Sequence, residues 1–231
     1  MKFKVIPFKK VISTQIRARK VMDQGDFLCI TADVQTGGYG QRGSKWKGDK
    51  KNLAYTLVLP LNFFENVYHI NILTGICWQE ILKKYKCDIK FKWSNDLYLN
   101  GKKLAGMLNE IEGGKVISGL GLNVEVAPKI KGKYKAVALK DVNPQIPVKS
   151  ELLELFLKKF ENALGNYKKN GIEKFFDKFK ASILYVGEKV ELQFNGKIIR
   201  GKFLGINEDG SCNIKTKLLK RRFYSGTLRP R

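Results

Sequence analysis

The chain has 231 residues, 43% of them hydrophobic and 28% charged, which is long enough for one hydrophobic core and a small appendage. The sequence contains neither an apolar N-terminal run nor a stretch of about 18 consecutive apolar residues, so it indicates no signal peptide and no membrane span. It predicts a cytoplasmic protein without a membrane partner, and its formal net charge is +23.

The positive charge comes mainly from lysine. Only eight of the 44 basic residues are arginine, and the 36 lysines are spread along the whole chain. Planar, bidentate recognition of phosphates and bases favours arginine. We therefore expect no DNA binding. The lysine-rich surface instead predicts a salt-sensitive encounter with an acidic partner.

The first elements predicted in chain order are a helix, two strands and a second helix. Cap-type residues begin a short helix over 13–25. Residues 26–36 and 52–60 have the composition of strands, and a glycine-rich basic loop separates them. Apolar residues at helical spacing predict a core-facing helix within 65–86.

An antiparallel meander follows this helix. Residues 89–93 and the turn signal Asn100-Gly101 predict a hairpin, and Gly113-Gly114 predicts a turn before the strand pattern of 115–126. Residues 150–181 then have a helical pattern.

The C-terminal segment has a different pattern. Short alternating strands over 187–231, with turns at Asn195-Gly196 and Asp209-Gly210, predict a small β-barrel domain. The whole chain therefore predicts an α/β (α+β) fold with a mixed, largely antiparallel sheet flanked by helices. The expected domains are residues 1–182 and 183–231.

The cysteines and the one histidine limit metal and nucleophilic chemistry. The four cysteines lie far apart in apolar or strand-like surroundings, without a Cys-x-x-Cys pair. We expect reduced core thiols, with a disulfide or metal site as the less favoured alternative. His69 is the only histidine, which excludes a His-rich zinc site and makes a Ser-His-Asp triad improbable.

The glycine-rich loop "QTGGYGQRGSKW", residues 35–46, is the first candidate binding element. Gly38, Gly40 and Gly43 match the G-x-G-x-x-G pattern of dinucleotide sites, but the loop leads into a strand instead of a helix. What remains is a loop whose backbone amides can approach an anion beside Arg42 and Lys45. A flexible surface loop without a ligand is the alternative.

The segment "FKWSNDLYLNGKKLAGMLNEI", residues 91–111, is the second candidate. Its hairpin should bring Lys92, Asp96 and Lys103 within reach of one another. Gly106 then lets a ligand approach the backbone. In "SGLGLNVEV", Asn123 interrupts an apolar run and is either a satisfied core amide or an amide that faces a ligand.

These two segments and "GLGLNV", in this order and spacing, resemble the three signature blocks of biotin protein ligases. The resemblance extends to "STQ" near the N-terminus and to the C-terminal "GEKVELQFNG" and "GINEDG", so it covers most of the chain. It implies the monofunctional type, which lacks an N-terminal helix-turn-helix domain, and an SH3-like C-terminal barrel. It also implies that ATP and biotin are substrates with Mg²⁺, that a biotin carboxyl carrier protein is the partner, and that a homodimer is possible.

The resemblance also implies roles for individual residues. The residues expected to bind biotin are Ser13, Thr14, Gln35, Gly38, Tyr39, Gly40, Trp46, Lys103 and Gly106. Those expected on the ATP side are Gln41, Arg42, Lys92, Asn95, Asn123 and Arg229. The expected catalytic residues are Lys103, Arg42 and Asp96, of which Asp96 serves either magnesium or the incoming lysine.

Three positions differ from the pattern of the family it resembles. Tyr39 and Gln41 stand where arginine is usual in the loop, and Ser94 stands where proline is usual. The loss of arginine at these loop positions predicts weaker binding of the phosphate. Two other classes of protein are the alternatives: a lipoate or octanoyl transferase, whose signatures differ, and a non-catalytic nucleic-acid-binding protein, which would leave the three blocks unexplained.

Overall fold

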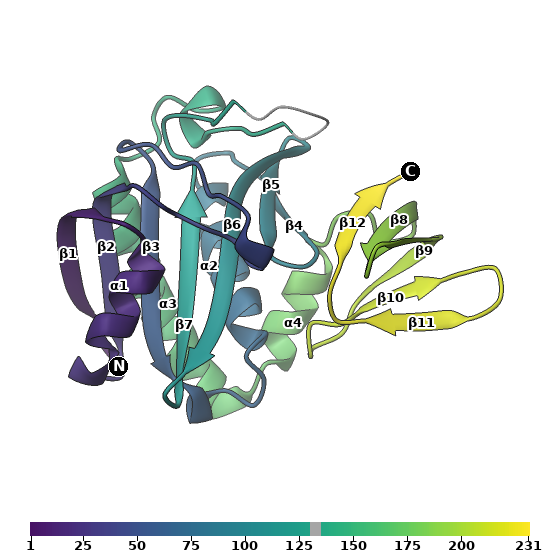
Figure 1. Cartoon of the computed structure of the whole chain (residues 1–231), viewed down its shortest axis with the longest axis horizontal. Helices are drawn as coiled ribbons and strands as arrows, with labels where there is room; N and C mark the ends of the chain where they lie inside the picture. The colour runs from purple at the N-terminus through teal and green to yellow at the C-terminus, as the bar shows by residue number, and fades with distance from the viewer. Residues whose placement is uncertain (130–134) are drawn as a thin grey trace.

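A computed structural model describes residues 1–129 and 135–231, and its main feature is a seven-stranded sheet (Figure 1). In spatial order the strands are β1 (Lys4–Val11), β2 (Leu28–Gln35), β3 (Leu53–Pro60), β7 (Lys115–Leu122), β6 (Lys102–Glu112), β5 (Asp96–Leu99) and β4 (Ile89–Lys92). Strands β1 and β2 are parallel, and all other neighbours are antiparallel. The predicted mixed, largely antiparallel sheet is confirmed.

Helix α1 (Thr14–Val21) covers one face of this sheet. It begins at Ser13, whose hydroxyl accepts a hydrogen bond from the Gln15 backbone amide at 3.2 Å, as expected of an N-cap. Ala18 and Val21 pack in a small apolar cluster with residues of β2, β3 and β7. Among the described residues, α1 is the only α-helix on this face (Figure 1).

The opposite face carries helices α2 (His69–Lys83), α3 (Lys149–Asn170) and α4 (Glu173–Lys180). Most of α2 is buried, and at its centre Trp78 stacks on Phe156 of α3, with ring centroids 5.0 Å apart and an interplanar angle of 10°. The Trp78 indole donates a hydrogen bond to the Tyr55 hydroxyl of β3 at 3.1 Å. This layer forms the main core of the chain.

The C-terminal strands form a second antiparallel sheet. Their order is β11 (Lys220–Phe223), β10 (Cys212–Lys215), β9 (Lys197–Ile206), β8 (Lys189–Phe194) and β12 (Thr227–Pro230). The predicted small SH3-like domain is confirmed. Among the described residues its sheet is not closed, because the outer strands β11 and β12 each pair on one side only.

The C-terminal part is tied to the first sheet by backbone hydrogen bonds. Phe91 of β4 donates to the Ser182 carbonyl and accepts from the Leu184 amide, both at 2.8 Å. Buried residues of the two parts belong to one continuous hydrophobic cluster. A domain boundary at residue 182 stays a prediction.

Strand β1 was not predicted from the sequence. It is an edge strand that contains Pro7, Lys9 and Lys10, residues that blunt an exposed edge and mask the usual strand pattern. The remaining short elements are 3₁₀ turns at Met22–Gln24, Gln41–Gly43, Leu61–Phe63 and Leu139–Asp141.

The cysteines follow the sequence prediction. All four are buried free thiols, and burial raises the pKa of Cys29 to about 12. Within residues 1–129 and 135–231, no helix is long and apolar enough to cross a membrane.

Truncation of Phe156 should test the main core. Phe156→Ala leaves a cavity beside Trp78 and Tyr55 and should lower the free energy of unfolding by about 3–5 kcal/mol. Its helix neighbour Leu155 is 40% exposed, so Leu155→Ala should cost less than about 1 kcal/mol. Urea unfolding of both variants measures the difference, and equal losses would contradict the described packing.

Candidate active site

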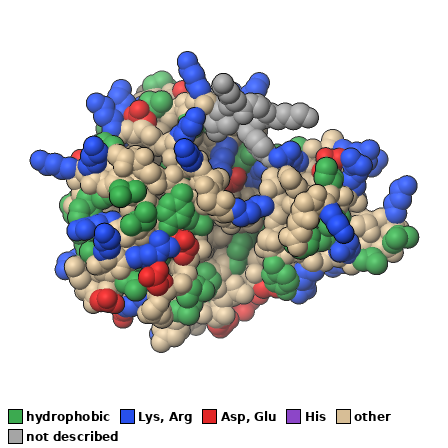
Figure 2. Space-filling model, in the orientation of Figure 1, with side chains coloured by type: hydrophobic (Ala, Val, Ile, Leu, Met, Phe, Trp, Pro, Cys, Tyr) green, Lys and Arg blue, Asp and Glu red, His purple; other side chains and the backbone are tan. Residues whose placement is uncertain are grey.

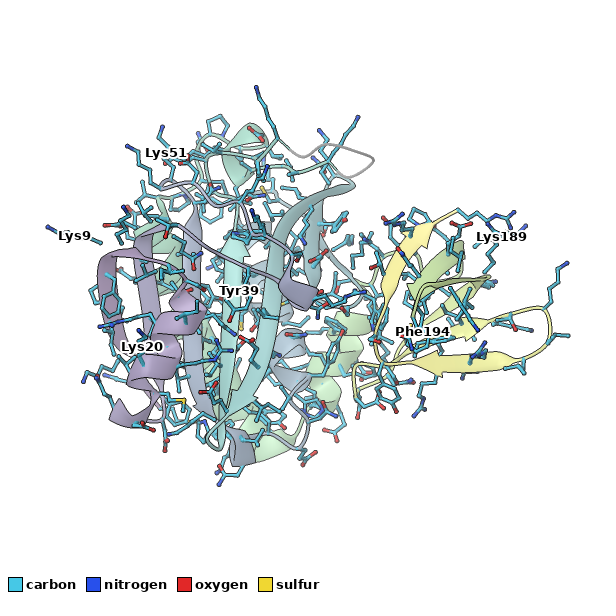
Figure 3. The ribbon with its side chains drawn as sticks, viewed as in Figure 1. Lys9, Lys20, Tyr39, Lys51, Lys189 and Phe194 are labelled. Carbon is cyan, nitrogen blue, oxygen red and sulfur yellow. The ribbon has the colours of Figure 1, made fainter. Side chains whose placement is uncertain are left out.

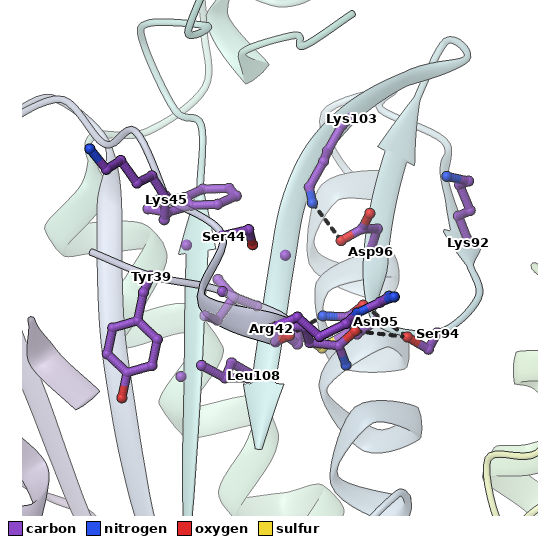
Figure 4. Close-up of a pocket in the computed structure, with 18 of the residues that line it drawn as sticks. Tyr39, Arg42, Ser44, Lys45, Lys92, Ser94, Asn95, Asp96, Lys103 and Leu108 are labelled. Carbon is purple, nitrogen blue, oxygen red and sulfur yellow. Dashed lines mark hydrogen bonds and ion pairs between the residues drawn. The ribbon is translucent and has the colours of Figure 1, made fainter. Parts of the chain in front are cut away.

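A cavity of about 620 Å³ opens on the uncovered face of the seven-stranded sheet (Figure 4). It is bounded by the start of α1, the loop after β2, the β4–β5–β6 hairpins and the beginning of β12. Every predicted site residue lines it except Gly38 and Asn123. Segments far apart in the sequence, from Ser13 to Arg229, therefore meet in one place.

The floor of the cavity depends on glycines. Gly106 of β6 pairs with Gly121 of β7, and the indole of Trp46 lies against both. A Cβ atom at Gly121 would come within 2.3 Å of the indole, so any side chain there would displace Trp46. The Trp46 amide donates to the Gly38 carbonyl at 2.9 Å, which places Gly38 behind the tryptophan instead of in the cavity wall.

One end of the cavity is a network of neutral polar groups. The Gln35 side-chain oxygen accepts hydrogen bonds from the Thr14 amide at 2.7 Å and the Thr14 hydroxyl at 3.1 Å. A backbone amide can only donate, so these contacts fix the orientation of the Gln35 carboxamide. Its NH₂ group is the donor that remains for a ligand carbonyl.

Two residues of this network were missed by the sequence analysis. Thr56 of β3 is fully buried, and its hydroxyl lies within hydrogen-bonding distance of the Thr14 hydroxyl and the Gln15 side-chain oxygen, to either of which it can donate. Gln15 donates to the Ile117 carbonyl at 2.8 Å, and the space it occupies exists because Gly119 has no side chain. The sequence signal was the spacing of Gly119 and Gly121, which leaves one face of β7 bare. Thr56 gave no such signal.

The other end of the cavity is charged. Lys103 Nζ lies 2.7 Å from Asp96 Oδ1, and both side chains are partly exposed to the cavity (Figure 4). Lys102, its neighbour along the strand, is exposed. The cationic side chains that line the cavity are Arg42, Lys45, Lys92, Lys103 and Arg229. Against them stands one described carboxylate, Asp96, so the cavity favours an anion.

Lys92 is the most deeply buried of these cations. Only 5% of it is exposed, and its ammonium donates to the Tyr98 hydroxyl at 3.3 Å. Burial lowers the pKa of the Lys92 ammonium. The positive charges of Lys103 and Arg229 lower this pKa further, whereas the negative charge of Asp96 raises it. An anion bound in the cavity would stabilise its charged form.

The described residues contain no cluster of three or more His, Cys, Asp or Glu side chains that could hold a metal ion. Asp96 alone does not form a complete set of metal ligands, and it already forms an ion pair with Lys103. Magnesium commonly keeps its waters and binds through one or two carboxylates and substrate phosphates. Asp96 could supply one such carboxylate.

The glycine-rich loop is held over the cavity at three points. The Tyr39 hydroxyl accepts from Arg19 at 2.9 Å and donates to Glu110 at 3.0 Å, which fixes the ring between α1 and the central strands (Figure 3).

Further along the loop, Gln41 accepts from the Ser94 hydroxyl at 3.3 Å. Arg42 donates to the Gly226 carbonyl at 3.2 Å and to the Thr227 hydroxyl at 3.3 Å. The loop thus bridges both sheets.

The turn between β4 and β5 is supported from the C-terminal sheet. The Trp93 indole donates to the Gly210 carbonyl at 2.8 Å, and the Tyr68 hydroxyl donates to the Ser94 carbonyl at 3.1 Å. Gly210 has a φ of +82°, and a Cβ atom there would lie 2.4 Å from the Tyr68 ring. Asn95, at the same turn, donates to the Met107 carbonyl.

A second cavity of about 480 Å³ adjoins the first. Lys45, Trp46 and Lys103 line both cavities. The second is also lined by Lys47, Asn123, Pro128, Lys129 and Ala136. Asn123 is 1% exposed, and its NH₂ group donates to the Val137 carbonyl at 3.2 Å. Its side-chain oxygen has no hydrogen-bond partner among the described residues, which favours the interpretation that this amide faces a ligand.

The two adjoining cavities share Lys45, Trp46 and Lys103, both are rich in cations, and one has an amide-lined end. This arrangement is typical of a class of protein that holds two ligands side by side. Comparison with known proteins agrees with this class: the chain belongs to the Biotin/lipoate A/B protein ligase family, whose match covers residues 10–126. The family predicted from the three sequence blocks is confirmed.

Individual relatives give the same picture. The chain is 28% identical over 175 residues to Biotin–protein ligase 2 of Arabidopsis thaliana, which covers 71% of this chain and 53% of the relative. It is 30% identical over 180 residues to Biotin–[acetyl-CoA-carboxylase] ligase of Mycobacterium tuberculosis, covering 74% and 66%. The chain thus spans about half to two thirds of the length of these curated relatives.

Among solved structures, the biotin protein ligase from Aquifex aeolicus in complex with biotin and ATP is similar over 99% of both chains. Its TM-score is 0.87 and its sequence identity 29%. The similarity therefore extends over both sheets.

Substitution of Gly210 should loosen the contact between the C-terminal sheet and the β4–β5 turn. Gly210→Ala combines an unfavourable positive φ with a clash against Tyr68 and should lower the free energy of unfolding by about 2–4 kcal/mol. Gly196, at φ +74°, has open space around it, so Gly196→Ala should cost only the conformational part, about 1–2 kcal/mol. If urea unfolding gives the two variants equal stability, Gly210 does not pack as described.

Proposed function

We propose that the protein is a biotin–[biotin carboxyl carrier protein] ligase. It would join biotin to ATP to give biotinyl-5′-AMP and pyrophosphate, and then transfer the biotinyl group to a lysine of the carrier. The observation that carries this proposal is the position of Lys103, which lines both adjoining cavities in a chain of this family. The similar ligase from Aquifex aeolicus forms a complex with biotin and ATP, which supports the assignment of the two ligands.

Biotin would occupy the first cavity. The NH₂ group of Gln35 and the hydroxyls of Ser13 and Thr14 can hydrogen-bond a ureido ring at the polar end. Tyr39, Gly40 and the bare floor at Gly106 would leave room for the ring system and the chain. Trp46 would cover the bound biotin, and the biotin carboxylate would then reach Lys103.

ATP would extend from Lys103 into the second cavity. The buried oxygen of Asn123, which lacks a described partner, can accept a hydrogen bond from an adenine amino group. Gln41, Arg42, Lys92, Asn95 and Arg229 line the first cavity, where the three cations would neutralise the triphosphate and the two amides would donate hydrogen bonds to it. The loop that carries Arg42 would exclude water from the intermediate.

The chemistry needs no covalent enzyme nucleophile. A carboxylate oxygen of biotin attacks the α-phosphorus, the bond from that phosphorus to the bridging oxygen breaks, and pyrophosphate leaves. Two anions must approach each other, so Lys103 between them lowers the repulsion and stabilises the charge that develops.

In the second half-reaction, the carrier amine attacks the acyl carbon and AMP leaves. Asp96, which lies 2.7 Å from Lys103, is the described carboxylate placed to accept a proton from the incoming ammonium. Magnesium would enter on the phosphates, with Asp96 as its one available carboxylate ligand from the cavity wall.

The carrier would meet a strongly basic surface. Lysine and arginine side chains are scattered over the visible face of the molecule (Figure 2), which suits fast encounter with an acidic protein domain. A homodimer, a cytoplasmic location and the absence of DNA binding stay predictions.

Avidin detection of a carrier domain, after incubation with biotin, ATP and magnesium, tests the function directly. The same incubation with lipoate or octanoate in place of biotin tests the rival acyl transfer, which the family name leaves open. Labelling with lipoate or octanoate, and none with biotin, would reject the proposal.

Removal of the Lys103 ammonium should nearly abolish adenylate formation. The loss of a charge-assisted contact to a buried anion costs about 1.5–3 kcal/mol, hence at least about tenfold in rate. Lys102→Ala is the matched control, because the neighbouring side chain points to the other face of the strand and should leave the rate almost unchanged. Pyrophosphate release reports the rate, and a wild-type rate for Lys103→Ala would remove this residue from the site.

Introduction of arginine at position 41 should slow escape of the intermediate. Glutamine can donate hydrogen bonds but offers neither a positive charge nor a bidentate fork to the phosphate. In Gln41→Arg, release of biotinyl-5′-AMP and labelling of bystander proteins, both measured without carrier, should decrease several-fold. Release as fast as that of the wild type would mean that the nearby lysines already retain the phosphate.

A further inference from the structure

The hairpin formed by β10 and β11 ends in two exposed leucines. Leu218 is 93% exposed, more than any other large hydrophobic side chain in the described residues, and Leu219 is 54% exposed. The turn is closed, because the Thr216 amide donates to the Leu219 carbonyl at 3.0 Å and the Leu219 amide donates to the Thr216 hydroxyl at 3.2 Å. The leucines are therefore displayed by a defined turn.

Positive charge surrounds this tip. The basic residues of the hairpin are Lys215, Lys217, Lys220, Arg221 and Arg222, and no Asp or Glu follows Asp209 in the chain. Arg221 lies over the Phe223 ring at 5.2 Å, and Arg222 lies 3.6 Å from Asp209. No described ion pair involves the three lysines of the hairpin, so their charge faces outward.

We propose that this tip, residues 215–222, docks on an anionic phospholipid surface. Exposed aliphatic side chains ringed by lysine and arginine suit a partner with negative headgroups above an apolar layer. A nucleic acid supplies phosphates but offers flat bases, which select aromatic stacking partners instead of leucine. The lipid surface is thus the partner that uses both features.

The shape of the tip also favours a membrane over a protein partner. A stable protein interface buries roughly 800 Å² on each side, far more than the end of one narrow hairpin can supply. A fluid lipid surface can enclose a convex tip of a few residues. Surface docking departs from the sequence expectation of no membrane partner, but it needs no spanning helix, and the described residues contain none.

The hairpin points away from the body of the molecule (Figure 1). At the end of the molecule where this loop lies, hydrophobic side chains are visible beside basic ones (Figure 2). Neither cavity is lined by residues 215–222, so docking would leave the candidate active site open to its substrates and carrier.

Co-sedimentation of the full chain with vesicles tests the proposal. Vesicles of equimolar phosphatidylcholine and phosphatidylglycerol should bind the protein, and vesicles of phosphatidylcholine alone should not. The tip variants are Leu218→Ser with Leu219→Ser and, separately, Lys217→Gln with Lys220→Gln. Each pair should weaken binding at least about tenfold, since each cation near the surface and each inserted leucine contributes several-fold.

Matched control pairs separate the tip from the general basic surface. Lys158→Gln with Lys169→Gln removes two exposed lysines of α3, and Ile111→Ser with Ile198→Ser removes two aliphatic side chains that are 57% and 58% exposed. Both should bind within about twofold of the wild type. Thermal unfolding shows whether each variant remains folded. The leucine pair and the lysine pair change different side chains, so if one pair fails to fold, the other still tests the tip.

Three results would overturn the proposal. The first is no binding to the anionic vesicles. The second is equal weakening by the control lysine pair, which would mean that net charge alone attracts the protein. The third is a tip substitution that weakens binding to a transfer RNA or an acidic carrier domain while vesicle binding stays unchanged.

Discussion

The register between β6 and β7 is the constraint on which the site depends. It sets Gly106 opposite Gly121, and the pair leaves a strip of bare backbone on the open face of the sheet. Trp46 lies on this strip, so the tryptophan, and with it the glycine-rich loop, can approach the sheet closely. A slip of one residue would turn side chains onto this face and would fill the cavity from below.

The loop above the strip is anchored by residues that differ from the pattern of the family. Tyr39 is held by Arg19 and Glu110, and Gln41 meets Ser94. Two of the unusual positions therefore contact each other, and the third is satisfied by a local network. The loop is thus anchored by hydrogen bonds from Tyr39 to a charged pair and from Gln41 to a neutral hydroxyl, without arginine at either position.

The sequence predicts these features unevenly. Long periodic segments such as α2 and the hairpin signals at Asn100-Gly101 were confirmed, because local patterns specify them. Strand β1 was missed since an edge strand needs no apolar pattern, and Thr56 was missed since only the register of β3 brings it to Thr14. The C-terminal barrel was expected from its short strands, but whether a sheet closes depends on its two outer strands, which no local signal reports.

The positive charge, which dominates the composition, is divided between two environments. Lys92 is almost fully buried beside the cavity, where water and counterions have little access. The lysines of the β10–β11 tip lie in solvent, within reach of ions that screen them over roughly 8 Å at physiological salt. Ionic strength should therefore weaken the attraction of a partner to the tip lysines more than the attraction of an anion to Lys92. The same composition thus includes screened surface cations and one buried cation beside the cavity, because burial and not net charge decides how each cation acts.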